Sequence, residues 1–190
     1  LATGNCVVVK PSESTPATGQ LYAELAQRAG FPAGVVNVVQ GNGAAGARLA
    51  AHPGLDGVLF TGSWSVGRRI LEATLDQPWK LVALEMGGKN GALVCADADL
   101  DAAAAAIAFG ACVTAGQRCS ATSRVFAERG IADALCEKLA RLFRGIAIGH
   151  SSDPGAFMGP LISRAARERH AKVLEIAAAE GARALVSGGP

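Results

Sequence analysis

The chain has 190 residues, of which 50% are hydrophobic and 18% are charged, and its formal net charge is +2. This balance, with no run of five like charges, argues against nucleic acid or an anionic membrane as a partner. The longest apolar stretch, residues 102–113, is shorter than the ~20 residues that a membrane-spanning helix needs. The five cysteines are odd in number and form no CxxC pair, which indicates reduced thiols in the cytoplasm instead of disulfides or a metal site.

Strands and helices are predicted to alternate in the first half. Short β-branched or apolar runs predict strands at 6–10, 35–39, 57–60 and 80–84. Helices are expected between them, one after Pro11 that ends before Gly30, and two at 44–52 and 66–75. This order is typical of an α/β fold with a parallel, Rossmann-like sheet and helices on its faces.

The second half predicts a further α/β lobe. Strands are expected at 91–95 and 124–128, helices at 100–113, 131–144 and 165–180, a loop-rich stretch at 145–161, and the start of a strand at 184–186. A boundary near 85–88 divides the chain into residues 1–86 and 87–190. Neither end reads as a natural terminus, so we expect both domains to be incomplete.

Lys10 and Glu13 directly follow the first predicted strand. In parallel α/β sheets, ligands bind beyond the carboxyl ends of the strands, so this pair could hold the hydroxyls of a ribose. A carboxylate there disfavours a 2′-phosphate, which favours NAD over NADP. The alternative is a solvated loop with the residues of a helix start.

Residues 41–46 read G-x-G-x-x-G between a strand and a helix, with Gly43 and Gly46 as its later glycines. This context matches the dinucleotide-binding fingerprint, but the acidic residue expected about twenty positions later is missing. The pattern therefore favours a close backbone approach to a cofactor without proving an ordinary pyrophosphate site.

Ser63 ends a small-residue turn between a predicted strand and a predicted helix, close to Phe60, Gly62 and Val66. Backbone N–H groups at such a helix start suit a pyrophosphate. Simple N-capping by Ser63 explains the same residues equally well.

Cys119 follows a polar Gly-Gln-Arg turn, whereas Cys95 lies in an apolar run. A reactive thiolate needs a partly exposed place with N–H donors, which a turn supplies. Glu85 stands at the end of a predicted strand, followed by Met86 and Gly87. An inert thiol and a solvated carboxylate are the alternatives.

These segments together resemble the aldehyde dehydrogenase superfamily. The resemblance runs through the stretches GNCVVVKPSESTP, FPAGVVNVVQGNG, HPGLDGVLFTGS, LEMGGKN, ADADLD and GQRC. It implies that Cys119 is the catalytic nucleophile and Glu85 the general base. The residues that it implies contact NAD are Lys10, Glu13, Gly43, Gly46, Phe60, Gly62, Ser63, Val66, Met86 and Gly87. Trp64 and Ser65 depart from the common Thr-Glu pair, and Met86 from the usual leucine.

The implied reaction is oxidation of an aldehyde to a carboxylic acid with NAD, through a thiohemiacetal and then a thioester on Cys119. Succinylglutamate-semialdehyde dehydrogenases of arginine catabolism are the most similar subfamily, with Arg118 and Arg124 as candidates to hold an anionic substrate. Two alternatives stay open: a relative that transfers the acyl group to coenzyme A, and a non-catalytic protein that keeps the fold.

The resemblance further implies a cytoplasmic homo-oligomer. An oxyanion-hole asparagine upstream of residue 1 and a ribose-binding glutamate beyond residue 190 are expected in full-length members. We therefore expect the isolated 190-residue chain to have little or no turnover.

Overall fold

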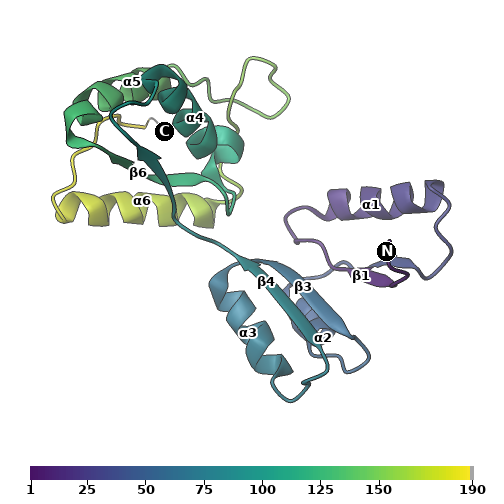
Figure 1. The fold of residues 1–190 in the computed structure, drawn as a ribbon. Coiled ribbons are helices and arrows are strands. Elements are labelled where there is room, and N and C mark those ends of the chain that lie inside the picture. Colours follow the sequence, from purple (N-terminus) through teal and green to yellow (C-terminus); the bar gives the residue numbers. More distant parts are fainter. Residues whose placement is uncertain (189–190) are drawn as a thin grey trace. The chain divides into compact units, whose positions relative to one another are not determined.

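A computed structural model describes residues 1–188 and is drawn in Figure 1. Its contacts divide the chain into two compact units, Leu1–Met86 and a second that begins at Gly87. Both units combine parallel strand pairs with helices. The predicted α/β class with incomplete parallel sheets is therefore confirmed.

The first unit opens with a parallel pair, β1 (Val7–Val9) and β2 (Val36–Val38), joined by helix α1 (Pro16–Arg28). α1 begins with a proline because the fixed φ of that residue suits the first turn of a helix. It ends just before Gly30, which takes a φ of +80° that other residues adopt at a cost. α1 packs against β2.

The rest of this unit contains β3 (Gly57–Gly62) and β4 (Leu81–Met86), which pair in parallel along their whole length. Helix α3 (Trp64–Thr74) packs on both strands, and α2 (Gly43–Ala50) packs on α3 (Figure 1). Side chains alternate along each strand. Those on the face away from α3, such as Leu59, are exposed.

The four strands of this unit form two separate pairs in the part that the structure describes, and not one four-stranded ladder. Alternation of apolar residues identifies a strand, but it carries no information on which neighbour accepts its hydrogen bonds. The strands themselves lie within two residues of the predicted ranges.

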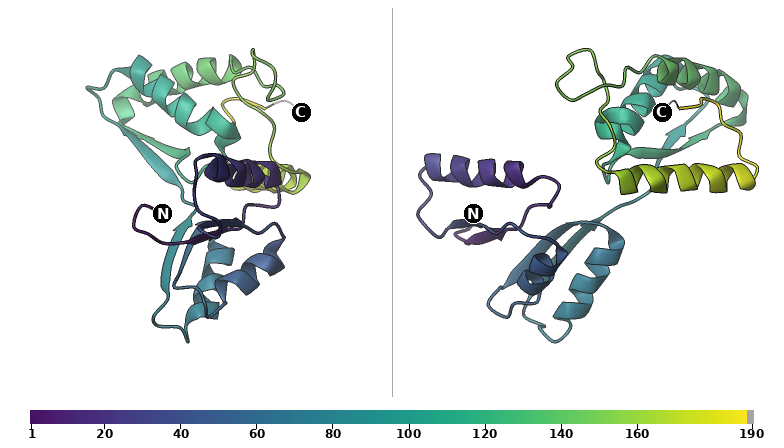
Figure 2. Two further views of the ribbon diagram at one scale, coloured as in Figure 1. Left: turned by 90° about the vertical axis from the view of Figure 1, so that its right-hand side faces the viewer. Right: turned by 180° about the vertical axis from the view of Figure 1, so that it is seen from behind.

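The second unit contains the parallel pair β5 (Asn90–Val94) and β6 (Thr122–Ala127), with helices α4 (Leu100–Cys112) and α5 (Ala132–Arg144). α4 and α5 pack against each other (Figure 2). A short 3-10 turn precedes α5 at Arg129–Ile131.

An apolar core lies between these elements, and its buried members are Val94, Ala104, Ile107, Leu135 and Leu139. A loop-rich stretch follows α5, as predicted, and it carries one isolated bridge between Ile148 and Met158. The last helix is α6 (Arg164–Ala179), none of whose residues is buried.

The predicted strand at 184–186 is wrong, because these residues pair with no other strand in the described part of the chain. A short apolar run becomes a strand only when another strand edge satisfies its backbone hydrogen bonds. No helix among residues 1–188 is both long and apolar enough to cross a membrane.

Candidate active site

Lys10 forms hydrogen bonds both with its own segment, residues 10–13, and with the glycine segment, residues 41–46. The register of β1 with β2 brings residues 10 and 41 to the same end of the pair, because the strands are parallel. The Nζ of Lys10 donates to the carbonyl oxygens of Pro11 at 2.6 Å and Gly41 at 2.9 Å. A carboxylate oxygen of Glu13 lies 3.7 Å from the same nitrogen, and this side chain is 64% exposed. The Glu13 carboxylate is therefore free to accept further hydrogen bonds.

Gly43 and Gly46 both lie in the first turn of helix α2, but their surroundings differ. A Cβ at Gly43 would meet open space, so this backbone can be approached from outside. A Cβ at Gly46 would lie 3.3 Å from Cδ of Lys10, so this glycine makes room for the lysine stem. The Asn42 side chain caps the helix by accepting from the N–H of Ala44. Packing thus accounts for Gly46 without a cofactor, whereas it gives no reason for Gly43.

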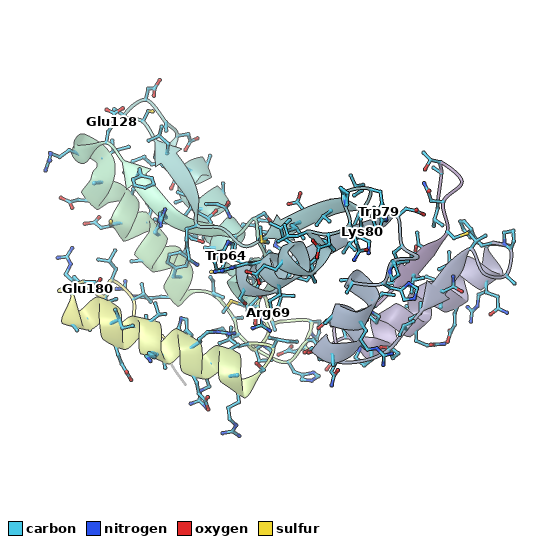
Figure 3. All side chains as sticks on the ribbon, turned by 90° about the horizontal axis from the view of Figure 1, so that it is seen from below. Trp64, Arg69, Trp79, Lys80, Glu128 and Glu180 are labelled. Carbon is cyan, nitrogen blue, oxygen red and sulfur yellow. The ribbon has the colours of Figure 1, made fainter. Side chains whose placement is uncertain are left out.

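Ser63 caps helix α3. Its Oγ lies 3.4 Å from the N–H of Val66, which donates to it, and 3.1 Å from Oγ of Ser65. The first N–H groups of any helix have no intrahelical partner, so capping by Ser63 leaves donors for an anion at this end. Trp64, the first residue of α3, is 62% exposed (Figure 3), and the guanidinium of Arg68 lies 5.7 Å from its ring centroid.

The Phe60 ring packs against the backbone of Gly62. The Phe60 ring would stand 2.4 Å from a Cβ at Gly62, so only glycine fits beside this ring orientation. Val66, in the first turn of α3, is 39% exposed. These residues shape the surface next to the Ser63 cap.

Glu85 and Met86 end β4 at the edge where β3 also ends. The register pairs Thr61 with Glu85 and Gly62 with Met86. Glu85 is exposed, which suits a carboxylate that must exchange protons with water. The Met86 sulfur would lie 2.6 Å from a Cβ on residue 67, a buried glycine of α3. Gly87, the first residue of the second unit, has open space around it.

The backbone before Cys119 is strained. The 3-10 turn Val113–Gly116 contains Thr114 and Ala115 at φ of 56° and 54°, followed by Gly116 at φ +66°. Left-handed backbone costs a non-glycine residue about 1–3 kcal/mol, and a β-branched threonine rarely adopts it. Only Gly116 fits its own position, since a Cβ there would lie 2.7 Å from the Ala111 carbonyl oxygen.

Cys119 is exposed on the turn that leads into β6. The Nδ2 of Asn90 donates to its carbonyl oxygen at 2.6 Å and to that of Ala121 at 3.0 Å. Thr122 and Arg124 pair with successive residues of β5, so the residue between them forms a bulge in β6. Bulges are frequent beside active sites, where they re-aim a side chain.

Exposure alone does not distinguish Cys119 from the other cysteines. All five thiols are free, and Cys6 and Cys95 are also exposed. Cys112, at the end of α4, is half-buried, and this burial raises the pKa of its thiol because the thiolate is poorly solvated there. No group of three or more His, Cys, Asp or Glu side chains among residues 1–188 is arranged to hold a metal ion.

The structure gathers the candidate residues into three sets. Lys10, Glu13, Gly43 and Gly46 lie at one end of the β1–β2 pair, and Phe60, Gly62, Ser63, Val66, Glu85 and Met86 lie around one end of the β3–β4 pair. Gly87 and Cys119 belong to the second unit.

Sequence reasoning missed two polar anchors, Lys80 and Asn90. Lys80 (Figure 3) is 7% exposed and donates to the carbonyl oxygens of Ala50, the last residue of α2, and of His52, just beyond it. A lysine at the first position of a predicted strand is a weak signal for such a role. For Asn90 no signal exists, because an asparagine shortly after a pair of glycines is typical of any turn.

The model of the aldehyde dehydrogenase family matches residues 1–190. The chain belongs to the aldehyde dehydrogenase family. It is 44% identical over its full length to the 2-hydroxymuconic semialdehyde dehydrogenase of Pseudomonas putida, of which it covers 39%. Over 97% of its length it is 45% identical to an N-succinylglutamate 5-semialdehyde dehydrogenase of Caulobacter vibrioides, of which it covers 40%.

Among solved structures, the chain resembles a point mutant of the betaine aldehyde dehydrogenase of Staphylococcus aureus in complex with NAD+. The TM-score is 0.92 at 36% identity, over 97% of this chain and 38% of that one. The chain thus spans about two fifths of the aldehyde dehydrogenases that it matches.

Proposed function

We propose that the full-length protein oxidises an aldehyde to a carboxylic acid with NAD as the hydride acceptor. The observation that carries this proposal is the exposed thiol of Cys119, on a strained and tethered turn, in a chain that the family model matches throughout. In this proposal residues 1–86 are part of the NAD-binding domain and residues 87–190 are part of the catalytic domain.

Cys119 is the proposed nucleophile. Its thiolate attacks the carbonyl carbon of the aldehyde, so a C–S bond forms and the carbonyl π electrons move to oxygen. The backbone N–H of Cys119 stabilises the oxyanion of this thiohemiacetal. Loss of hydride from the former carbonyl carbon leaves a thioester on the sulfur.

Glu85 is the proposed base for the second half of the reaction. It takes a proton from a water molecule as the water oxygen attacks the thioester carbon. The C–S bond then breaks, which returns the Cys119 thiolate and releases the carboxylic acid. A glutamate in this role favours hydrolysis over acyl transfer to coenzyme A.

The described residues fit a dinucleotide. The Glu13 carboxylate, beside Lys10, would accept from the adenosine ribose hydroxyls, and this favours NAD over NADP. The free N–H groups at the start of α3, behind Ser63, would hold the pyrophosphate. The backbone at Gly43 is open to a ligand, and it lies two residues after Gly41, whose carbonyl oxygen accepts from Lys10. When bound, the nicotinamide supplies the hydride acceptor.

We propose a semialdehyde as the substrate, such as N-succinylglutamate 5-semialdehyde. Support comes from two relatives of 44% and 45% identity that are both named as semialdehyde dehydrogenases. Arg118 and Arg124 are exposed on either side of the Cys119 turn and could hold an anionic end of the substrate. We further propose that the protein works as a homo-oligomer in the cytoplasm, where its free thiols stay reduced.

The test is NADH formation by the full-length protein with a panel of semialdehydes. We expect Cys119→Ser to lose at least about a thousandfold in kcat, because the nucleophile is gone. We expect Glu85→Gln to keep a first burst of NADH and then to slow by about 100-fold or more, because the thioester persists. Cys95→Ser and Glu128→Gln, changes at exposed residues elsewhere, are the matched controls.

Turnover that survives in Cys119→Ser would disprove the nucleophile. Release of an acyl-coenzyme A in place of a free acid would disprove the role of Glu85 and favour the transferase alternative. Complete inactivity of the unaltered protein on every aldehyde would favour the non-catalytic alternative.

A further inference from the structure

Asn90 uses both hydrogens of its side-chain amide on one turn. It is the first residue of β5, and its Nδ2 lies 2.6 Å from the carbonyl oxygen of Cys119 and 3.0 Å from that of Ala121. An amide nitrogen has two hydrogens to donate, so a single side chain holds the backbone on both sides of Ser120. The register between β5 and β6 is irregular at this same residue.

Two other bonds to this turn are local: the N–H of Ala121 donates to the carbonyl oxygen of Arg118 at 3.1 Å, and the Ser123 hydroxyl donates to that of Ala121 at 3.1 Å. Upstream, Thr114 and Ala115 keep left-handed backbone, from which an untethered chain would relax. Gln117 provides a second tether, because its Oε1 accepts from the N–H of Ile162 at 3.0 Å. The Cys119 side chain itself is exposed, so packing does not fix it.

We propose that Asn90 is a positioning residue for Cys119, an inference that rests on the proposed function. Fixing the Cys119 carbonyl fixes the peptide plane that follows its Cα, and this restricts the directions that the Cα–Cβ bond, which carries the sulfur, can take. Because a nucleophile misplaced by ~1 Å can cost about 100-fold in rate, this tether should matter for turnover and not for cofactor affinity.

The chain offers a matched control in Asn37. Its Nδ2 also donates to two carbonyl oxygens, those of Val7 at 3.3 Å and Gly34 at 2.8 Å, but it lies in the first unit. The experiment compares Asn90→Ala and Asn90→Asp with Asn37→Ala and Asn37→Asp in the full-length protein. Two quantities are measured: hydrogen exchange of the amides at 117–121, and kcat with the KM values for NAD and aldehyde.

We expect both Asn90 variants to exchange faster at 117–121 and to lose about tenfold or more in kcat, with the KM for NAD changed less than about twofold. Asn90→Asp should lose more than Asn90→Ala, because its carboxylate has no hydrogens to donate and faces two carbonyl oxygens. The Asn37 variants should leave exchange at 117–121 unchanged.

The proposal is overturned if the Asn90 variants leave exchange at 117–121 unchanged, or if their kcat falls no further than that of the Asn37 variants. A failure of the proposed function gives a different result. In that case the Cys119→Ser variant has the same turnover as the unaltered protein, or neither protein reacts with any aldehyde. In that case hydrogen exchange alone decides whether Asn90 holds the turn.

Discussion

The two units bury different kinds of residue. In Leu1–Met86 the buried side chains are few and include two polar ones, Thr74 and Lys80, with Ala50 as the apolar member. In the second unit the buried residues form an apolar cluster around Leu135 and Leu139. The first unit is thus held locally by side chains that bind backbone carbonyls, and the second by contact between helices and strands. Substitutions should therefore destabilise the two units through different physical effects.

The largest expected effect is in the apolar cluster. Leu135 is 2% exposed, so Leu135→Ala should cost the second unit about 2–5 kcal/mol through lost burial and a cavity. Hydrogen exchange of the α5 amides in the full-length protein measures this cost locally. Leu142→Ala, on the same helix at 37% exposure, is the control and should cost clearly less. Equal losses in both variants would show that the cluster is not the stabilising feature.

A smaller effect is expected at the buried lysine of the first unit. Lys80→Met keeps the apolar stem but leaves the carbonyl oxygens of Ala50 and His52 without their donor. Unsatisfied buried acceptors cost about 1–3 kcal/mol, which should appear as faster hydrogen exchange in α2 and not in α5. Lys89→Met, at an exposed position, should change neither helix. Faster exchange in α5 as well would mean that the two units are not stabilised independently.

The smallest effect concerns an exposed ion pair of the second unit, in which Lys138 on α5 donates to Asp101 on α4. The hydrogen bond from Lys138, and then its charge, lower the pKa of Asp101. A lowered carboxyl pKa stabilises the fold above the ordinary value of 3.8, and this contribution is lost as the pH falls through the lowered value.

Asp101→Asn should therefore lower the thermal midpoint at pH 7 by only about two degrees or less. Calorimetry should show this difference shrinking at acidic pH and in 1 M salt, about the concentration that screens exposed charges. Asp97→Asn, at an exposed position nearby in the sequence, is the control. A difference that persists at low pH would show that the charge of Asp101 is not responsible.

Most of the fold could be predicted from the sequence, because each helix and strand carries its own periodicity and breakers. Ser63 and Asn42 precede helices that they cap, and Gly30 follows one that ends, so these boundaries are local properties. Strand pairing is not local. The separation of β1–β2 from β3–β4, and the failure of 184–186 to form a strand, depend on partners that periodicity does not identify.

The candidate site was predicted as a set of residues but not as a set of contacts. The sequence identifies Lys10 and Gly46 as separate candidates, whereas the structure shows that one makes room for the other. The left-handed backbone at Thr114 and Ala115 could not be predicted, because neither residue type favours it. The two hydrogen bonds of Asn90 span a long stretch of chain and have no local signal either.

The contact between Met86 and Gly67 has an evolutionary consequence. A Cβ at position 67 would lie 2.6 Å from the Met86 sulfur, so the glycine and the flexible thioether occupy one shared volume. The constraint acts on position 67: a larger residue there requires the side chain at 86 to be shorter or to turn away, whereas Met86 can be shortened with Gly67 unchanged. We therefore expect larger residues at position 67 to occur only with a shorter or redirected side chain at position 86, although the two positions lie 19 apart in the sequence.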